Sequence, residues 1–174
     1  MIIGEVQNNN EVIISMIKTW KRLFDRAHYH AVDGSYWWTI RQKAQSGGVK
    51  GWLALHNYHK YNDNHGSYIS IDATFAGRPT LPHGIYGVFI SSRATIGKDC
   101  TIFQQVTIGS NQLKDSKGNG SPVIGDNVYI GCGAKIIGNV TIGDNVRIGA
   151  NCIVTEDIPD NCTVVLNKPR VIQK

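Results

Sequence analysis

The sequence predicts a mainly β protein, in which a parallel β-helix of six-residue repeats follows a short α-helical N-terminal region. The first observation is an aliphatic residue at every sixth position, and the second is a smaller apolar residue two places before most of these. The third is the helical spacing of apolar residues near the start of the chain. A fixed internal period is the signature of a repeat architecture. The aliphatic series is Ile90, Ile96, Ile102, Ile108, Ile124, Ile130, Ile136, Ile142, Ile148 and Val154.

The N-terminal region is expected to begin with an amphipathic helix, which Asn8 to Asn10 can cap. Its apolar residues recur at spacings of three and four, which places them on one helical face. They are Val12, Ile13, Met16, Ile17, Trp20, Leu23 and Phe24.

Two further helices are expected before the repeats begin. One runs from about Ser35 to Ala44, and Ser46, Gly47 and Gly48 end it. A short third helix is predicted around Trp52 to Leu55, ahead of the polar segment NYHKYNDNHG. Three short helices make a poor core alone. We therefore expect residues 1–66, the helical region, to pack on residues 67–174, the β-helical domain.

Each six-residue unit of the repeat is predicted to form a short strand and a turn, so that three units close one triangular coil of about 18 residues. The aliphatic residue of each unit stacks on its counterparts in the neighbouring coils. The smaller residue lies near the corner, where a large side chain does not fit. Gly, Asn and Asp in the turns tolerate a positive φ angle. The smaller residues are Val88, Ala94, Cys100, Val106, Val128, Ala134, Val140, Val146 and Cys152.

The repeat is interrupted once, because Ile108 and Ile124 are 16 positions apart, which is not a multiple of six. The extra residues fall in the polar segment SNQLKDSKGNGSP, residues 110–122. A rigid stack of coils most simply extrudes such a segment as a surface loop. Loops on rigid scaffolds often carry function.

Composition excludes several classes of protein. The net charge of +5 comes without a dense run of Lys and Arg or interleaved aromatic residues, so a nucleic-acid binder is not favoured. The chain shows neither a signal peptide nor a membrane-spanning apolar run, which predicts a cytoplasmic protein. No C-x-x-C pair or Cys/His cluster occurs, so we expect free thiols and no metal site. The four cysteines are Cys100, Cys132, Cys152 and Cys162.

The hexapeptide pattern resembles that of the left-handed parallel β-helix acyltransferases, and this resemblance implies the left-handed turn. Within that group, residues 81–174 resemble the serine O-acetyltransferases and the relatives that acetylate sugars. The matching segments are LPHG, ATIGKDCTIFQQVTIGS, the loop before Pro122, IGDNVYIGCGAKIIGNVTIGDNVRIGANCIV and the ending NKPRVI. The resemblance implies an O-acetyltransferase with acetyl-CoA as co-substrate and without a metal.

Acetyl transfer to a hydroxyl needs a base, and histidine suits that task near neutral pH. Of the six histidines, only His83 lies within the β-helical part, in a Pro-His-Gly turn. The resemblance implies that His83 is the catalytic base. In the serine enzymes a carboxylate one coil earlier orients the histidine. Asp72 is the candidate here at a short spacing, and a backbone carbonyl is the alternative.

Two positions depart from the serine enzymes. Those enzymes have an acidic residue directly before the histidine, where this chain has Pro82. They also have a histidine before the proline that ends the loop, where this chain has Ser121. Because these groups recognise the serine amine and carboxylate, their replacement favours a neutral acceptor, a sugar or polysaccharide precursor hydroxyl. L-Serine is the alternative acceptor.

The resemblance also implies a homotrimer with acetyl-CoA between the subunits. Small residues along the coil edges would let the pantetheine arm approach the backbone, although β-helix corners need glycine and alanine in any case. Lys168 and Arg170 match the basic tail that holds the CoA phosphates, and Thr155 is a further candidate although Glu156 replaces the usual lysine. The small candidates for CoA contact are Gly109, Gly131, Gly133, Ala134, Gly149 and Ala150.

Two other functions are known for a β-helix of this kind or compatible with it: a γ-class carbonic anhydrase and a non-catalytic scaffold. A γ-class carbonic anhydrase needs zinc-binding histidines on successive coils, and no histidine follows His83. A non-catalytic trimeric scaffold would not bind acetyl-CoA. The aromatic residues of the helical region indicate helix packing, with a role at the acceptor site as the alternative.

Overall fold

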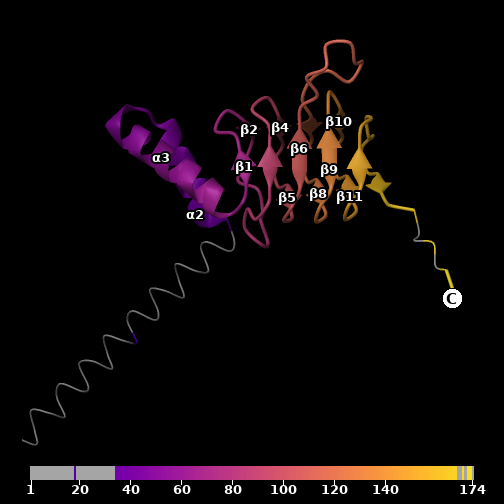
Figure 1. Cartoon of the computed structure of the whole chain (residues 1–174), viewed down its shortest axis with the longest axis horizontal. Helices are drawn as coiled ribbons and strands as arrows, with labels where there is room; N and C mark the ends of the chain where they lie inside the picture. The colour runs from indigo at the N-terminus through magenta and orange to yellow at the C-terminus, as the bar shows by residue number, and fades with distance from the viewer. Residues whose placement is uncertain (1–17, 19–33, 168–169, 171, 174) are drawn as a thin grey trace, which may run out of the picture.

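The fold was analysed on a computed structural model that describes residue 18, residues 34–167, residue 170 and residues 172–173. Two helices lie at one end, and the coils of a β-helix follow along the long axis of the molecule (Figure 1). The helices are α2 (Ser35–Gln45) and α3 (Gly48–Asn64). The helix predicted over residues 12–24, with its asparagine cap, lies outside the described residues except for residue 18.

Helix α2 agrees with the prediction, whereas α3 is longer than predicted and includes most of the polar segment 57–66. The reason is tertiary contact. Tyr58 and Asn62 lie one turn apart and are buried. The Tyr58 hydroxyl donates to the carbonyl of Ile69 at 2.8 Å, and the Ile69 amide donates to Asn62 Oδ1 at 3.1 Å. These contacts to the first strand hold a segment that apolar spacing alone does not identify as helical.

Burial raises the pKa of Tyr58 to about 12, the neighbouring Arg41 charge opposing this. Between about pH 10 and pH 12 the Tyr58 hydroxyl is therefore protonated in the folded protein and deprotonated in the unfolded chain, whose tyrosine pKa is about 10. The resulting stability is complete below about pH 10 and is lost as pH rises to about 12, about 2–3 kcal/mol in all. We expect Tyr58→Phe to remove this alkaline loss of unfolding free energy, measured by urea denaturation at several pH values. The exposed control Tyr68→Phe should retain the loss, and an unchanged profile for Tyr58→Phe would contradict the prediction.

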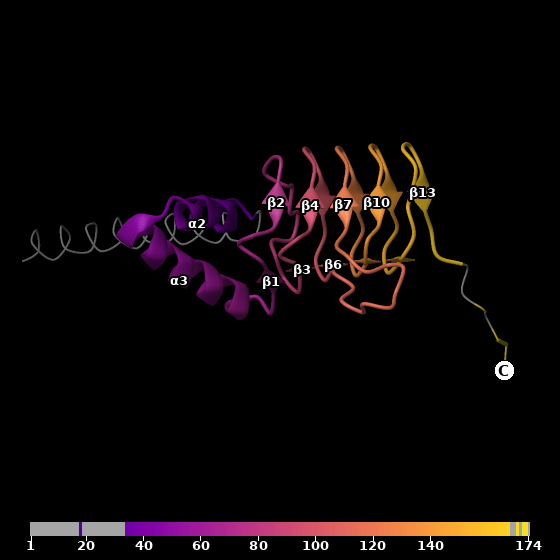
Figure 2. The ribbon, with the colours of Figure 1, turned by 90° about the horizontal axis from the view of Figure 1, so that it is seen from above.

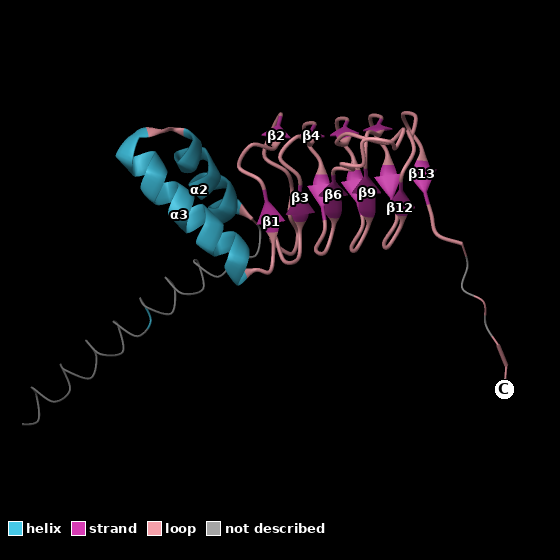
Figure 3. Cartoon of the chain, turned by 45° about the horizontal axis from the view of Figure 1, so that its top comes forward, coloured by secondary structure: helices cyan, strands magenta, loops and turns pink. Residues whose placement is uncertain are grey.

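The strands form three parallel sheets. Because the coils are triangular, their stack is a three-sided prism, and each sheet is one of its faces. The first face has the order β1-β3-β6-β9-β12, the second β2-β4-β7-β10 and the third β5-β8-β11-β13. Turns join the faces at the three corners (Figures 2 and 3). The strands are β1 (Tyr68–Ile69), β2 (Thr74–Phe75), β3 (Phe89–Ile90), β4 (Thr95–Ile96), β5 (Thr101–Ile102), β6 (Thr107–Gly109), β7 (Val123–Ile124), β8 (Tyr129–Ile130), β9 (Lys135–Ile137), β10 (Thr141–Ile142), β11 (Arg147–Ile148), β12 (Ile153–Val154) and β13 (Thr163–Val164).

The six-residue period is confirmed by burial and register. Every aliphatic residue of the predicted series is buried in one continuous core, as are the smaller residues at the corners. Ile90 pairs with Ile108, and Ile124 with Ile142, each 18 positions apart. The predicted β-helix with its 18-residue coil is therefore confirmed.

Two coils are longer than 18 residues. Ile69 pairs with Ile90, 21 positions on, and the three extra residues lie in the corner formed by residues 81–88. Ile108 pairs with Ile136, 28 positions on, because this coil contains the predicted loop 110–122. A bridge between Asn111 and Gly120 closes that loop, which projects from the stack in Figure 1. Both interruptions leave the stacking register intact.

The helices cover the first coil. Arg41 of α2 is buried and donates to the carbonyls of Ile71 and Ala73 in the first coil, and Gln45 Nε2 also donates to the Ile71 carbonyl at 3.2 Å. Its guanidinium also lies over the rings of Trp38 and Phe75, and burial lowers its pKa. The prediction that the helical region caps the β-helix is confirmed for α2. The division at residue 66 stays a prediction.

Two absences concern only the described part of the chain. None of its helices is long and apolar enough to cross a membrane. Its four cysteines form no disulfide, as expected, and burial raises the pKa of the Cys100 thiol.

Candidate active site

His83 lies in the enlarged corner, residues 81–88, which connects the third face to the first. The amide of Gly84, at a positive φ of 65°, donates to the carbonyl of Leu81 at 3.0 Å and closes the turn that presents His83. The corner is fastened to the end of α3, because the Gly87 amide donates to the carbonyl of His65 at 3.1 Å. An exposed histidine thus lies on a well-anchored turn.

The imidazole of His83 makes two contacts with the next coil. Its Nδ1 lies 2.8 Å from Gln104 Oε1, and its ring packs edge-on against Phe103, with the centroids 5.6 Å apart and the planes at 88°. No hydrogen bond to any described residue occupies Nε2. One nitrogen is therefore held by the protein and the other is available to a substrate.

Asp72, the predicted orienting acid, is not brought to His83. It lies exposed at the corner between β1 and β2, where its backbone amide donates to Ser70 Oγ at 3.2 Å. A residue eleven positions before His83 belongs to a different corner of a triangular coil. The expected carboxylate partner is replaced in the structure by the amide of Gln104.

Five of the predicted CoA residues share the corner of His83. Gly131, Gly133 and Ala134 lie two coils after that of His83, and Gly149 and Ala150 lie one coil further along this edge. The Gly133 amide donates to the carbonyl of Gln104 at 3.0 Å. Stacking explains Gly131 and Gly133. A Cβ on Gly131 would lie 2.7 Å from the amide nitrogen of Ala150, and Gly133 has a φ of 70°. Their contact with CoA stays a prediction.

The other predicted CoA residues lie elsewhere. Gly109 ends β6 and Thr155 follows β12, so both lie toward the corner that carries the loop. Arg170 is exposed in the C-terminal tail, and Lys168 lies outside the described residues.

Sequence reasoning missed Phe103, Gln104 and Lys135. The Lys135 ammonium donates to the carbonyls of Gly133 at 2.9 Å and Gln105 at 3.2 Å, which places a cation on the edge of small residues. A uniform 18-residue coil stacks His83 on Thr101. The three extra residues shift its partner to Gln104, 21 positions later. The available signal was the segment LPHGIYGV, which is too long for a normal corner.

The base of the loop is fixed by polar contact. Ser121 Oγ lies 2.8 Å from Ser110 Oγ, which joins the two ends of the loop. Pro122 is buried, and its carbonyl accepts from the Thr95 amide at 3.1 Å. Ser121 thus occupies the position expected for an acceptor-binding histidine and is used for loop closure.

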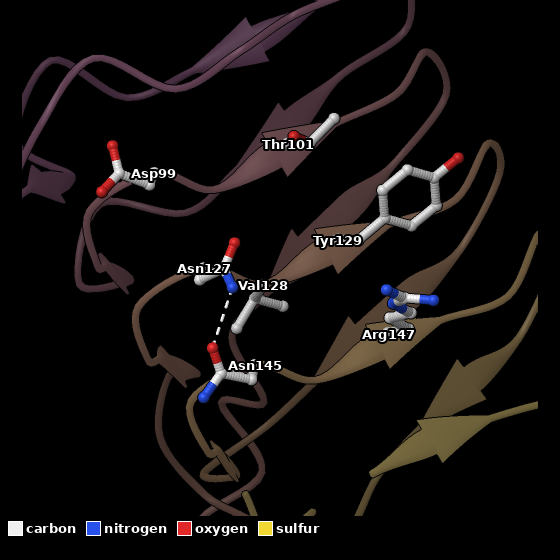
Figure 4. Close-up of a pocket in the computed structure, with 7 residues that line it drawn as sticks. All are labelled: Asp99, Thr101, Asn127, Val128, Tyr129, Asn145 and Arg147. Carbon is white, nitrogen blue, oxygen red and sulfur yellow. Dashed lines mark hydrogen bonds between the residues drawn. The ribbon is translucent and has the colours of Figure 1, made fainter. Parts of the chain in front are cut away.

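A cavity of about 450 Å³ lies on the third face, near the corner between the second and third faces. Figure 4 shows Tyr129 and Arg147 on neighbouring strands, with Asn127 Nδ2 donating to Asn145 Oδ1 at 2.8 Å. Phe103 connects this face to His83, because its ring centroid is 5.1 Å from that of Tyr129. The cavity is lined by Asp99, Thr101, Asn127, Val128, Tyr129, Asn145 and Arg147.

The described residues include no group of three or more His, Cys, Asp or Glu side chains that could hold a metal ion. The corner presents an oriented imidazole at one end of an edge of small residues. Such an arrangement can accept a proton from a hydroxyl.

Fold and sequence together define a left-handed parallel β-helix built of hexapeptide repeats. Residues 121–156 match the family model described as "Bacterial transferase hexapeptide (six repeats)". The predicted fold class is confirmed, including its left hand.

Within this class the chain is similar to serine acetyltransferases. It is 44% identical over 94 residues to the Synechococcus elongatus enzyme, covering 54% of this chain and 37% of the relative. It is 43% identical over 93 residues to the Staphylococcus aureus enzyme, covering 53% and 42%. The predicted resemblance is confirmed, while the chain spans less than half the length of these relatives.

Solved structures give the same result. Serine acetyltransferase isoform 3 from Entamoeba histolytica, in complex with cysteine, has a TM-score of 0.67 at 33% identity, covering 81% of this chain and 50% of that one. The Neisseria gonorrhoeae serine acetyltransferase, in complex with serine, has a TM-score of 0.63 at 29% identity, covering 78% and 56%. A serine acetyltransferase complex with CoA has a TM-score of 0.54 at 29% identity, covering 64% and 43%.

Proposed function

We propose that this chain is an acetyl-CoA-dependent O-acetyltransferase with His83 as the general base. The observation that carries the proposal is the exposed imidazole of His83, held through Nδ1 by Gln104 on the next coil. The similarity of the β-helix to serine acetyltransferases supports the reaction class, and the relative solved with CoA supports the co-substrate.

In the proposed reaction, His83 Nε2 accepts the proton of the acceptor hydroxyl as its oxygen attacks the thioester carbonyl. The C–O bond forms, the tetrahedral intermediate collapses, and the C–S bond breaks. The thiolate of CoA then takes the proton from the imidazolium and leaves as the free thiol. No redox change occurs, and the base returns to its starting state.

The edge formed by Gly131, Gly133, Ala134 and Ala150 is the proposed path of the pantetheine arm. Gly109 and Thr155 would lie farther along the first face, and Lys168 and Arg170 would meet the CoA phosphates. Lys135 adds a cation beside this edge. A homotrimer, with acetyl-CoA between subunits, is part of the proposal.

L-Serine is the acceptor that the relatives favour. The expectation of a sugar acceptor receives no support from these relatives. It rests on Pro82 and on Ser121, whose hydroxyl lies 2.8 Å from Ser110 Oγ. We therefore rank L-serine first and a neutral sugar hydroxyl second.

The test is release of free thiol from acetyl-CoA, measured with a thiol reagent against L-serine and a panel of sugars. Serine turnover well above background hydrolysis is the expected result. Turnover of a sugar but not of serine would replace the first acceptor by the second. If acetyl-CoA does not bind at millimolar concentration in calorimetry, the enzyme proposal fails and a non-catalytic scaffold is the better reading.

A further inference from the structure

We propose that Gln104 is a positioning residue that holds His83 with its proton on Nδ1, so that Nε2 is left free to accept a proton. The tautomer follows from the geometry of the two side chains. Its value for catalysis rests on the proposed function of His83. The uncharged amide of Gln104 would then orient His83, which is the role predicted from the sequence for Asp72.

The hydrogen bond decides the tautomer. A neutral imidazole has one N–H and one bare nitrogen. The atom that faces His83 Nδ1 at 2.8 Å is the carbonyl oxygen of the Gln104 side chain, which can only accept. The proton must therefore lie on Nδ1. Phe103, edge-on at 5.6 Å, restricts rotation of the ring about this bond.

The backbone of Gln104 is fixed from both sides. Its carbonyl accepts from the Gly133 amide at 3.0 Å in the following coil. The amide of the adjacent Gln105 donates to the carbonyl of Tyr86 at 2.9 Å in the preceding coil. Gln104 is half-buried, whereas Gln105 points into solvent. The coil stack itself therefore sets the position from which the amide reaches His83.

In the described part of the chain, no carboxylate hydrogen bonds to His83. Its imidazole contacts only Gln104 and Phe103 there. The titratable groups on this edge include Tyr86 in the same corner and Tyr129, whose ring contacts Phe103. They also include Lys135, whose ammonium donates to the carbonyls of Gly133 and Gln105. An amide orients the ring without placing a negative charge beside it.

Two variants of the full chain separate orientation from packing. Gln104→Met keeps the length of the side chain and removes the acceptor oxygen. Gln104→Glu restores an acceptor that cannot turn round to donate. Gln42→Met, on an exposed position of α2, is the control for the same chemical change far from the site. Histidine-labelled protein gives the protonation of each ring nitrogen by ¹H–¹⁵N NMR, independently of any activity.

We expect the wild-type spectrum to show His83 protonated on Nδ1. Gln104→Met should lose this preference and lower kcat about 10- to 100-fold, a part of the 10²–10⁴ that acid–base catalysis supplies. Gln104→Glu should retain the Nδ1 proton and most of kcat. Its acid limb should move to higher pH, because a carboxylate favours the imidazolium. Gln42→Met should match the wild type in every measurement.

Other results overturn the inference. His83 protonated on Nε2 in the wild type would do so, as would a Gln104→Met protein with unchanged tautomer and kcat. A third result separates the two proposals: the wild-type protein shows the Nδ1 proton, Gln104→Met loses it, and no acceptor is acetylated. This result supports the positioning role. In that case the proposed function fails alone.

Discussion

Replacing His83 by alanine is expected to lower kcat for acetyl transfer by about 10²- to 10⁴-fold, the usual contribution of a general base. The reason is that Nε2 of His83, which makes no hydrogen bond to a described residue, is the proposed acceptor of the hydroxyl proton. Thiol release from acetyl-CoA with the best acceptor measures the effect. Because the side chain is exposed, its loss should leave the unfolding free energy and acetyl-CoA affinity close to wild type.

The matched control is His56→Ala, an exposed histidine on α3. It should retain wild-type kcat, which excludes a general effect of removing an imidazole. Full turnover by His83→Ala would remove His83 from the mechanism. Calorimetry with acetyl-CoA separates loss of the base from loss of the co-substrate.

The largest expected effect on stability comes from the core of the prism. Ile130 of β8 is 0% exposed and pairs with both Ile102 and Ile148. Ile130→Ala leaves a cavity between coils that the paired backbones cannot close. The unfolding free energy should fall by about 2–5 kcal/mol, measured by urea denaturation followed by circular dichroism.

Ile153 of β12 provides the comparison, because it is 69% exposed on the outside of the first face. Ile153→Ala should change the unfolding free energy by no more than about 0.5 kcal/mol. Equal losses in the two variants would mean that the inward stack of isoleucines does not dominate stability.

Much of the fold could be predicted from the sequence because each coil repeats the same six-residue unit of a strand and a turn. The series from Ile90 to Val154 is buried as predicted, because residues at every sixth position stack on their counterparts in neighbouring coils. The length of α3 could not be predicted from the sequence. Its second half is held by Tyr58 and Asn62 through contacts with β1, which no local pattern encodes.

The candidate site was predicted in part. The resemblance singled out His83, and the structure places it beside the small residues of the same corner. Its partner could not be found from an ideal repeat, because the extra residues of corner 81–88 change which residue lies against it. Asp72 was chosen for its charge and its nearness in sequence. In a coiled chain, nearness in sequence does not place two residues at the same corner.

The parallel stack also fixes the distance between residues at its two ends. His83 belongs to the first coil, and Arg170 follows the last. In the proposed function, the number of coils between them sets the span that acetyl-CoA would bridge. Each coil advances about 4.8 Å, the spacing of hydrogen-bonded strands. Removing or duplicating one whole coil would therefore change this span in a single defined step while leaving every corner intact. In the proposed function, the number of coils thus determines how far acetyl-CoA would have to extend from the C-terminal tail to His83.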